Sequence, residues 1–339
     1  MTPHAAPPCT MTSAMITLVA EIAQTIGRLT AADAEKDSLR LRRVNRIRTI
    51  QGSLAIEGNT LTQEQITAIL DGKKVIAPPR EIQEVRSAIK AYDLFEQWTP
   101  HSETDLLKAH SVLMAGLIDA PGMYRTGGVG VMSGSTVIHM APPASRVPDL
   151  MASLLEWLKT TELHPLISSS IFHYEFEFIH PFEDGNGRMG RLWQTLILSR
   201  CNPIFANVPV ESMVYSHQKE YYDAISRSTK NGESSVFVEF MLRTILEALT
   251  VQKTPGVTPQ VTPEVKKLLA AMAGDMSRAE IQAKLGLKDE KHFREAYLRP
   301  AAAQGLIEMT IPDKPNSRLQ KYRLTEQGQS MKKKNNNRR

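Results

Sequence analysis

Twelve consecutive residues combine side chains that suit chemistry on a bound phosphate: His180-Pro-Phe-Glu-Asp-Gly-Asn-Gly-Arg-Met-Gly-Arg191. Gly185 and Gly187 allow a tight turn. A helix that starts beside them would direct main-chain amides and the positive end of its dipole towards an anion. Arg188 and Arg191 are three residues apart, so in the first helical turn they share a face and can reach further phosphates. The segment therefore predicts a polyphosphate site, and a triphosphate suits it better than a single phosphate.

Asp184 and His180 flank this predicted site. Mg²⁺ commonly takes one or two carboxylates together with substrate oxygens, so Asp184 is the candidate metal ligand. Histidine titrates near neutral pH, which makes His180 the candidate general base for an incoming hydroxyl. With Asn186 between the two glycines, the segment predicts nucleotidyl transfer.

The elements that must position this segment are predicted to be helical, with one exception. Gly127 to Met140 combines short β-prone runs with a Ser-Gly-Ser turn, which predicts a surface β-hairpin. Elsewhere apolar residues recur at three- and four-residue spacing. The predicted helices are Ile16 to Leu29, Leu39 to Ile56, Gln63 to Leu70, Glu81 to Trp98, Ser102 to Leu117, Val147 to Leu158, Pro165 to Ile179, Asn186 to Leu198, Ser212 to Ile225 and Val236 to Leu249.

A second domain is predicted after a Pro- and Thr-containing linker. Its expected order is a helix (Glu264 to Met272), a helix opened by the capping box Ser277-x-x-Glu280, a third helix (Glu290 to Gln304) and two strands. The strands are Leu306 to Ile311 and Lys321 to Leu324. This is the order of a winged helix.

Segment 180–191 matches without departure the Fic signature His-x-Phe-x-(Asp/Glu)-Gly-Asn-Gly-Arg-x-x-Arg, and residues 15–250 resemble that family in their order of elements. The resemblance implies a mainly α fold: a Fic-type helical bundle with a β-hairpin flap, followed by a winged helix-turn-helix domain. The expected parts are a disordered leader (1–12), an N-terminal helical region (13–100), a catalytic core (101–250), a linker (251–262), the winged helix (263–328) and a basic tail (329–339).

The resemblance also implies an activity, the transfer of AMP from ATP, with Mg²⁺, to Ser, Thr or Tyr hydroxyls of a protein target and of the chain itself. The 127–140 flap would hold the target segment by strand addition. The implied residues are His180 as base, Phe182 as loop anchor, Asp184 as Mg²⁺ ligand, Gly185, Asn186, Gly187, Arg188 and Arg191 as phosphate contacts, and Tyr222, with Tyr215 and Tyr221, near the adenine.

Ser53, Glu57 and Gly58 resemble the family's inhibitory motif (Ser/Thr)-x-x-x-Glu-(Gly/Asn). Taken alone, they are a Ser and a Glu on one helical face with Gly58 after the helix end. With the resemblance, Glu57 is expected to pair with Arg191 and to misalign ATP. The same glutamate could orient a water for removal of AMP, and the sequence does not separate the two roles.

Two other functions fit parts of the sequence. A metal-dependent hydrolase would use the cluster His173, Glu175, Glu177, His180, Glu183 and Asp184, but its spacing matches no standard zinc motif and leaves the arginines without a role. A DNA-binding regulator would use the winged helix, with Lys288, Lys291, His292, Arg294 and Arg299 as contacts. Alternatively, the winged helix could recruit a protein target or a second copy of the chain in a homodimer.

The charge composition indicates which part of the chain could bind an anionic partner. Residues 263–339 hold 17 basic and 9 acidic residues, whereas the first 262 hold 24 and 27, so the second domain is the part suited to an anionic partner.

No apolar run approaches the length of a membrane span, so we expect a cytoplasmic protein that does not contact membrane. Cys9 and Cys201 form no disulfide framework, and we expect Cys201 to lie in the core.

Overall fold

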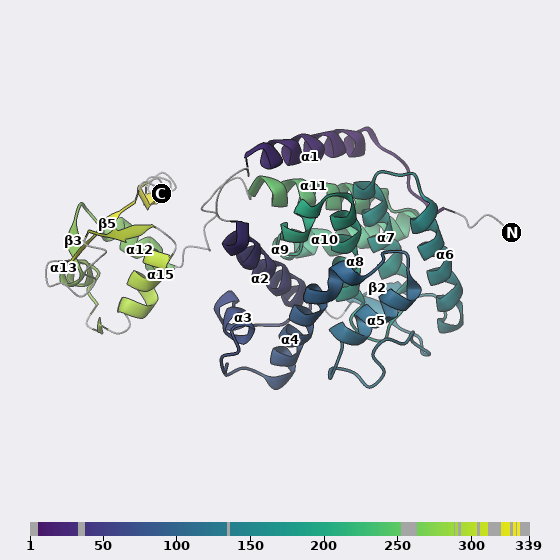
Figure 1. Ribbon diagram of the computed structural model, residues 1–339, viewed down its shortest axis with the longest axis horizontal. Helices are drawn as coiled ribbons and strands as arrows, with labels where there is room; N and C mark the ends of the chain where they lie inside the picture. The colour runs from purple at the N-terminus through teal and green to yellow at the C-terminus, as the bar shows by residue number, and fades with distance from the viewer. Residues whose placement is uncertain are drawn as a thin grey trace. The chain divides into compact units, whose positions relative to one another are not determined.

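The chain divides into two compact units, Met1–Lys253 and Thr254–Arg339, each with its own hydrophobic core. In this computed structural model the described residues are 6–32, 38–133, 136–251, 263–287, 289–290, 293–303, 306–310, 320–325, 328–329 and 331–332 (Figure 1). The division falls inside the predicted linker 251–262. The fold is mainly α, as predicted.

The first unit is a helical body with one antiparallel β-hairpin (Figure 1). Its elements are α1 (Ser13–Ala32), α2 (Ser38–Ile56), α3 (Gln63–Leu70), α4 (Pro79–Leu94), η1 (Phe95–Gln97), α5 (Glu103–Leu113), β1 (Gly130–Ser133), β2 (Thr136–Met140), η2 (Ala144–Arg146), α6 (Val147–Thr160), α7 (Pro165–Ile179), α8 (Asn186–Cys201), η3 (Pro203–Asn207), α9 (Val210–Ser216), α10 (Gln218–Asn231) and α11 (Ser235–Val251).

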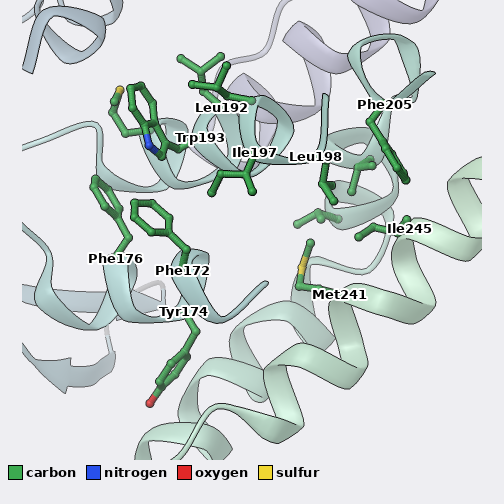
Figure 2. Close-up of a cluster of buried hydrophobic side chains, with 14 of the residues drawn as sticks. Phe172, Tyr174, Phe176, Leu192, Trp193, Ile197, Leu198, Phe205, Met241 and Ile245 are labelled. Atoms are coloured by element: carbon green, nitrogen blue, oxygen red, sulfur yellow. The ribbon is translucent and has the colours of Figure 1, made fainter. Parts of the chain in front are cut away.

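Helices α7 and α8 form the centre of this unit. Both are buried on almost all sides, as expected for helices that are covered all round rather than amphipathic. Figure 2 shows Phe172 and Phe176 of α7 in one cluster with Trp193 and Ile197 of α8. Because both helices are fixed by this packing, the loop that joins them, which carries the predicted site, has a fixed starting point and end point.

One predicted helix is in fact two. The range Ser212 to Ile225 is split between α9 and α10 at His217. The His217 amide still donates to the Met213 carbonyl (3.0 Å), as in a continuous helix. The His217 ring, however, pairs with Glu247 of α11 (3.0 Å). Apolar residues keep helical spacing on both sides of His217, so the sequence pattern did not predict the break between α9 and α10.

The leader also differs from expectation in the part that the structure describes. Ser234 donates its amide and its hydroxyl hydrogens to the Pro8 carbonyl (2.9 and 3.0 Å), and Thr12 donates to Glu239 (2.7 Å). An amide just before a helix lacks an intrahelical acceptor, and the leader supplies one at the start of α11. Residues 8–12 are therefore ordered by contacts with a segment more than 200 positions away, which composition alone could not show.

The second unit combines short helices with a three-stranded antiparallel sheet in the order β3-β5-β4. Its elements are α12 (Pro263–Ala271), β3 (Met276–Ser277), α13 (Arg278–Lys284), η4 (Phe293–Leu298), α15 (Arg299–Ala303), β4 (Ile307–Met309) and β5 (Lys321–Leu324). The predicted capping box of Ser277 and Glu280 is present. The predicted third helix begins, where it is described, as the π-helical segment η4, and β3 was not predicted.

Cys201 is exposed at the last residue of α8, so its assignment to the core is wrong. The helix continues to Cys201, but the core-facing positions end earlier. Among the described helices, none is both long enough and apolar enough to cross a bilayer.

Candidate active site

The predicted site lies in the loop between α7 and α8. His180 ends α7 in the left-handed region (φ 50°, ψ 62°), and it is the one residue other than glycine with positive φ in the described part of the chain. Gly185 precedes α8 at φ 85°, and a Cβ there would lie 2.6 Å from the Met114 sulfur. The backbone angle thus favours glycine at position 185, and any other residue would also displace the Met114 side chain.

Asn186 closes this loop. Its side-chain oxygen accepts the Phe182 amide, and its side-chain nitrogen donates to the Phe182 carbonyl, both at 2.9 Å. The structure therefore engages the Asn186 side chain with the loop backbone, where the resemblance implied a phosphate contact. The amides of Asn186 and Gly187 belong to the first turn of α8, whose N–H groups lack intrahelical acceptors, so an anion can still bind there.

Phe182 is fully buried, as predicted for the loop anchor, and it stacks on the ring of His110 from α5 (centroids 3.6 Å apart, planes 3° apart). Gly122 donates its amide hydrogen to His110 Nδ1 (2.8 Å). Nε2 therefore carries the ring proton and donates it to the Asp184 carbonyl (3.0 Å). Burial lowers the pKa of His110 to about 4, which keeps this ring neutral and in one tautomer at physiological pH.

Asp184 faces two arginines. Its Oδ1 accepts the Gly185 amide (2.6 Å) and Arg188 (2.9 Å), and its Oδ2 accepts Arg80 (3.3 Å). Arg188 is buried and also lies 3.9 Å from Glu84. Arg80 and Glu84 belong to α4, and sequence analysis missed both because no local pattern connects α4 to the loop.

Arg191 is buried and meets the predicted inhibitory residues. It donates to Glu57 Oε1 (2.6 Å), to the Ser53 carbonyl (3.0 Å) and to the Ser53 hydroxyl (3.2 Å). Burial alone would lower the pKa of Arg191, but the charge and hydrogen bond of Glu57, together with the charges of Tyr221 and Glu177, raise it above the ordinary value. The predicted pairing of Glu57 with Arg191 is therefore confirmed as a contact.

The end of α2 presents Glu57 in this orientation. Gly58, at φ 91°, follows the helix end, its amide bonds to the Ala55 carbonyl (3.0 Å), and the Asn59 amide bonds to the Leu54 carbonyl (3.1 Å). These two hydrogen bonds form a Schellman motif, which requires the left-handed conformation that glycine adopts most easily. Gly58 thus fixes where α2 stops and where Glu57 points.

Glu177 is the buried acid beside His180. Its carboxylate lies 3.8 Å from His180 Nδ1, and its carbonyl lies 3.4 Å from the same nitrogen. Burial raises the pKa of Glu177 to about 7, although Arg191 opposes the shift. His173, one turn earlier, bonds to Gln194 (2.7 Å), and burial lowers its pKa to about 3. His173 is therefore a neutral core residue.

The three tyrosines that were predicted near the adenine differ in their burial. Tyr221 is buried with its hydroxyl on His173 (3.1 Å), and Tyr215 is 46% exposed. Tyr222 is half-buried, and the pKa of its hydroxyl is raised by burial and then by the charge of Glu57. The charges of Glu57 and Arg191 act on both Tyr221 and Tyr222, so both lie near the site.

The structure does not assemble the His and carboxylate cluster that a metal hydrolase would need. No group of three or more His, Cys, Asp or Glu side chains that could hold a metal ion occurs within the described ranges. The flap is present as a hairpin, with Gly130 paired to Met140 and Ser133 to Thr136 and a bulge between Val131 and Met132. Of the predicted DNA contacts, Lys288, Lys291 and His292 lie outside the described residues, Arg294 lies in η4, and Arg299 begins α15.

Two family profiles match the chain. The Fic/DOC family matches residues 100–198, and the C-terminal domain of filamentation induced by cAMP protein Fic-like matches residues 263–325. Among curated relatives, a protein adenylyltransferase Fic from Nematostella vectensis is 29% identical over 206 residues, which cover 57% of this chain and 45% of the relative. A protein of the same name from Culex quinquefasciatus is 30% identical over 207 residues, 58% of this chain and 39% of the relative. The chain thus spans less than half the length of these relatives.

Solved structures extend the likeness to both units. Fic-1 (residues 134–508) from C. elegans is 23% identical with a TM-score of 0.55 over 70% of each chain, which shows the shared fold. A Fic family protein from Desulfovibrio desulfuricans G20 is 51% identical with a TM-score of 0.72, over 95% of this chain and 99% of that one. Identity at this level over nearly a whole solved protein shows that the chain belongs to the Fic family.

Proposed function

We propose that the chain transfers AMP from ATP to a Ser, Thr or Tyr hydroxyl of a protein target, including a second copy of itself, with release of pyrophosphate. The observation that carries the proposal is the turn from α7 to α8. It places His180 at one end and the amide-bearing start of α8 at the other, with Asp184, Arg188 and Arg191 around it. The names of the relatives support this activity at family level.

In the proposed reaction, His180 is the base. Its Nδ1 faces Glu177, so we assign the proton transfer to Nε2. Nε2 removes the hydroxyl proton while the hydroxyl oxygen bonds to the α-phosphorus of ATP. The bond from that phosphorus to the oxygen bridging the α- and β-phosphates breaks, and pyrophosphate leaves with the electron pair. The amides of α8 bind the phosphates, and Arg188 and Arg191 neutralise their charge.

The chemistry around Asp184 fits a role in holding Mg²⁺. Its side chain is 38% exposed, and a carboxylate beside bound phosphates supplies the oxygen donors that Mg²⁺ takes. Mg²⁺, when bound, would neutralise charge on the phosphates. The site residues themselves have two tasks: Arg80 and Arg188 balance the carboxylate, and His110 orients the backbone of Asp184.

Glu57 is proposed to inhibit this reaction. Because its carboxylate occupies the Arg191 guanidinium at 2.6 Å, that arginine is not available to the terminal phosphate, and ATP binds with its α-phosphorus out of line. A misplacement near 1 Å can cost about 100-fold in rate. Replacing Glu57 with glycine should therefore increase AMP transfer. If Glu57 instead orients a water, the modified chain should lose AMP on incubation, and Glu57→Gly should stop that loss.

Intact-mass measurement after incubation with ATP and Mg²⁺ tests the proposal. We expect a gain of one AMP on the chain, a gain on the order of 100-fold faster in Glu57→Gly, and none in Glu57→Gly combined with His180→Ala. Gain of a phosphate instead of AMP would overturn the reaction type. An unchanged rate in Glu57→Gly would overturn the inhibition but not the transfer.

A second proposed function concerns the C-terminal unit. The excess of basic over acidic residues after position 262 favours an anionic partner, and the helices and three-stranded sheet are compatible with a winged helix that binds DNA. We propose DNA binding as an addition to the enzyme activity, because no position of the Fic signature is degraded.

A further inference from the structure

Arg125 makes a set of contacts that neither the motif nor the proposed reaction accounts for. It is 6% exposed, and its guanidinium donates to four backbone carbonyls. The acceptors are His180 (2.7 Å), Gly127 (2.8 Å), Pro142 (2.5 Å) and Ile179 (3.2 Å). The Arg125 amide also donates to the Pro181 carbonyl (2.9 Å).

These carbonyls come from three segments of the chain, and the Arg125 guanidinium contacts all three. Gly127 precedes β1 and Pro142 follows β2, so the two form the base of the hairpin. Next to them the Ala141 amide bonds to the Val129 carbonyl (3.2 Å), which closes the hairpin ladder. The third segment is the end of α7 with the turn at His180. One guanidinium therefore joins both ends of the hairpin base to the turn that carries the proposed base.

The turn needs such support. A left-handed conformation is unfavourable for a residue other than glycine, and it persists only where surrounding contacts fix it. Arg125 fixes the peptide planes on both sides of His180, because its side chain binds the Ile179 carbonyl before this residue and the His180 carbonyl after it. A planar fork of donors can bind carbonyls in several directions at once, which the ammonium of lysine cannot reproduce.

We infer that Arg125 is a positioning residue that sets the distance between the hairpin, where a target segment would add as a strand, and the imidazole of His180. The inference rests on the proposed function for the identity of that hydroxyl-bearing segment. The inference predicts that a change at Arg125 impairs AMP transfer to a protein acceptor but not the binding of ATP. Transfer to a protein acceptor depends on the hairpin and His180 together, whereas the contacts assigned to ATP lie on the far side of the loop, from Asp184 to Arg191.

The test uses the full chain with Glu57→Gly, and adds Arg125→Met or Arg125→Lys. Arg200→Met is the matched control, because Arg200 also donates to two backbone carbonyls, those of Glu96 (2.6 Å) and Trp98 (2.8 Å), at the opposite end of α8. The acceptor is a defined protein, the His180→Ala chain, titrated against a fixed amount of enzyme. Three quantities are measured: amide hydrogen exchange across residues 127–142, ATP affinity by calorimetry, and AMP transfer to the acceptor.

In both Arg125 variants we expect hairpin amides to exchange at least about 10-fold faster, as loss of a charged hydrogen bond would cause. We expect AMP transfer to fall on the order of 100-fold, with unchanged ATP affinity. Arg200→Met should match the parent in all three. Hairpin exchange equal to the parent in Arg125→Lys, or transfer and ATP affinity falling together, would overturn the inference. If no chain gains AMP, the proposed function fails, and hydrogen exchange still decides whether Arg125 joins hairpin and turn.

Discussion

At the scale of single residues, burial affects the pKa of Glu177 more than the neighbouring charges do. Five other titratable or charged groups surround it: His173, His180, Arg191, Glu57 and Tyr221. Its pKa is about 7 because the carboxylate is 4% exposed, and the like charge of Glu57 adds to the shift while Arg191 opposes it. Near neutral pH this acid changes charge next to the proposed base.

Glu177 should therefore make stability depend on pH. Its folded pKa is raised above the unfolded value, so its contribution is complete below about pH 4.5 and is lost as pH rises through 7. Compared with Glu177→Gln, which does not titrate, the natural chain should lose thermal stability between pH 5 and pH 8, by roughly 2–4 °C per kcal/mol. Melting curves at both pH values measure this. Glu156→Gln, at a half-exposed position of α6, is the control for replacing a carboxylate with an amide.

How far a residue could be predicted from sequence depended on how local its contacts are. The bond from Asn186 to Phe182 and the pair of Arg188 with Asp184 each span four positions, so one short motif contains both partners. Arg80 contacts the loop across 104 positions, and no local pattern marks it. Glu57 was found across a similar distance because its own motif resembles a family pattern.

The same distinction applies to His110 and Arg125. Each is a single polar residue in an otherwise ordinary segment, and its role follows from which carbonyl it meets, that of Asp184 for His110 and that of His180 for Arg125. These meetings depend on how α5 and the segment before β1 pack against the α7–α8 loop. Sequence periodicity predicts that such helices exist, but not which of their polar side chains reach the loop.

At the scale of elements, the contact of Glu57 with Arg191 depends on how closely α2 approaches α9. Gly52 lies inside α2, four residues before its last residue, where glycine is unfavourable for a helix. A Cβ at this position would lie 2.6 Å from the Ser212 nitrogen and 2.7 Å from the Glu211 backbone, so only glycine allows the two segments to meet. Glu57 follows five residues later, and its position is therefore set in part by this contact.

Gly52→Ala should consequently move α2 and weaken the contact of Glu57 with Arg191 without altering either side chain. We expect AMP transfer to rise, by less than in Glu57→Gly, and stability to fall by roughly 1–3 kcal/mol as in other overpacked sites. Intact-mass rates and thermal melting measure the two effects. Gly27→Ala on α1 is the control, because a Cβ there meets nothing within 4 Å.

The transfer rates of these variants distinguish an effect of Gly52→Ala through Glu57 from an effect on stability alone. If α2 acts through Glu57, adding Gly52→Ala to Glu57→Gly should give no further increase in transfer. A destabilised Gly52→Ala chain that transfers AMP at the parent rate would show that the position of Glu57 does not depend on this packing. Gly27→Ala should leave transfer unchanged and raise stability by roughly 0.5–1 kcal/mol.

At the scale of the whole molecule, charge divides along the same line as the two cores. The first 262 residues hold 24 basic and 27 acidic residues, and the remaining 77 hold 17 and 9. A basic unit joined to a slightly acidic one favours binding of a polyanion through the second unit alone. The proposed enzyme chemistry and the proposed DNA contact should therefore be separable.

A salt titration of DNA binding tests this separation. For the full chain, the logarithm of the association constant should fall linearly with the logarithm of salt concentration, with a slope near −0.9 for each neutralised phosphate. A chain that ends at residue 251 should lose this binding, yet retain AMP transfer if its own core suffices for folding. Binding that persists in the shortened chain, or that does not change between roughly 50 and 200 mM salt, would rule out a phosphate contact by the second unit. Because the shortened chain keeps the whole α7–α8 loop, its AMP transfer also shows whether the second unit is needed for the chemistry at His180.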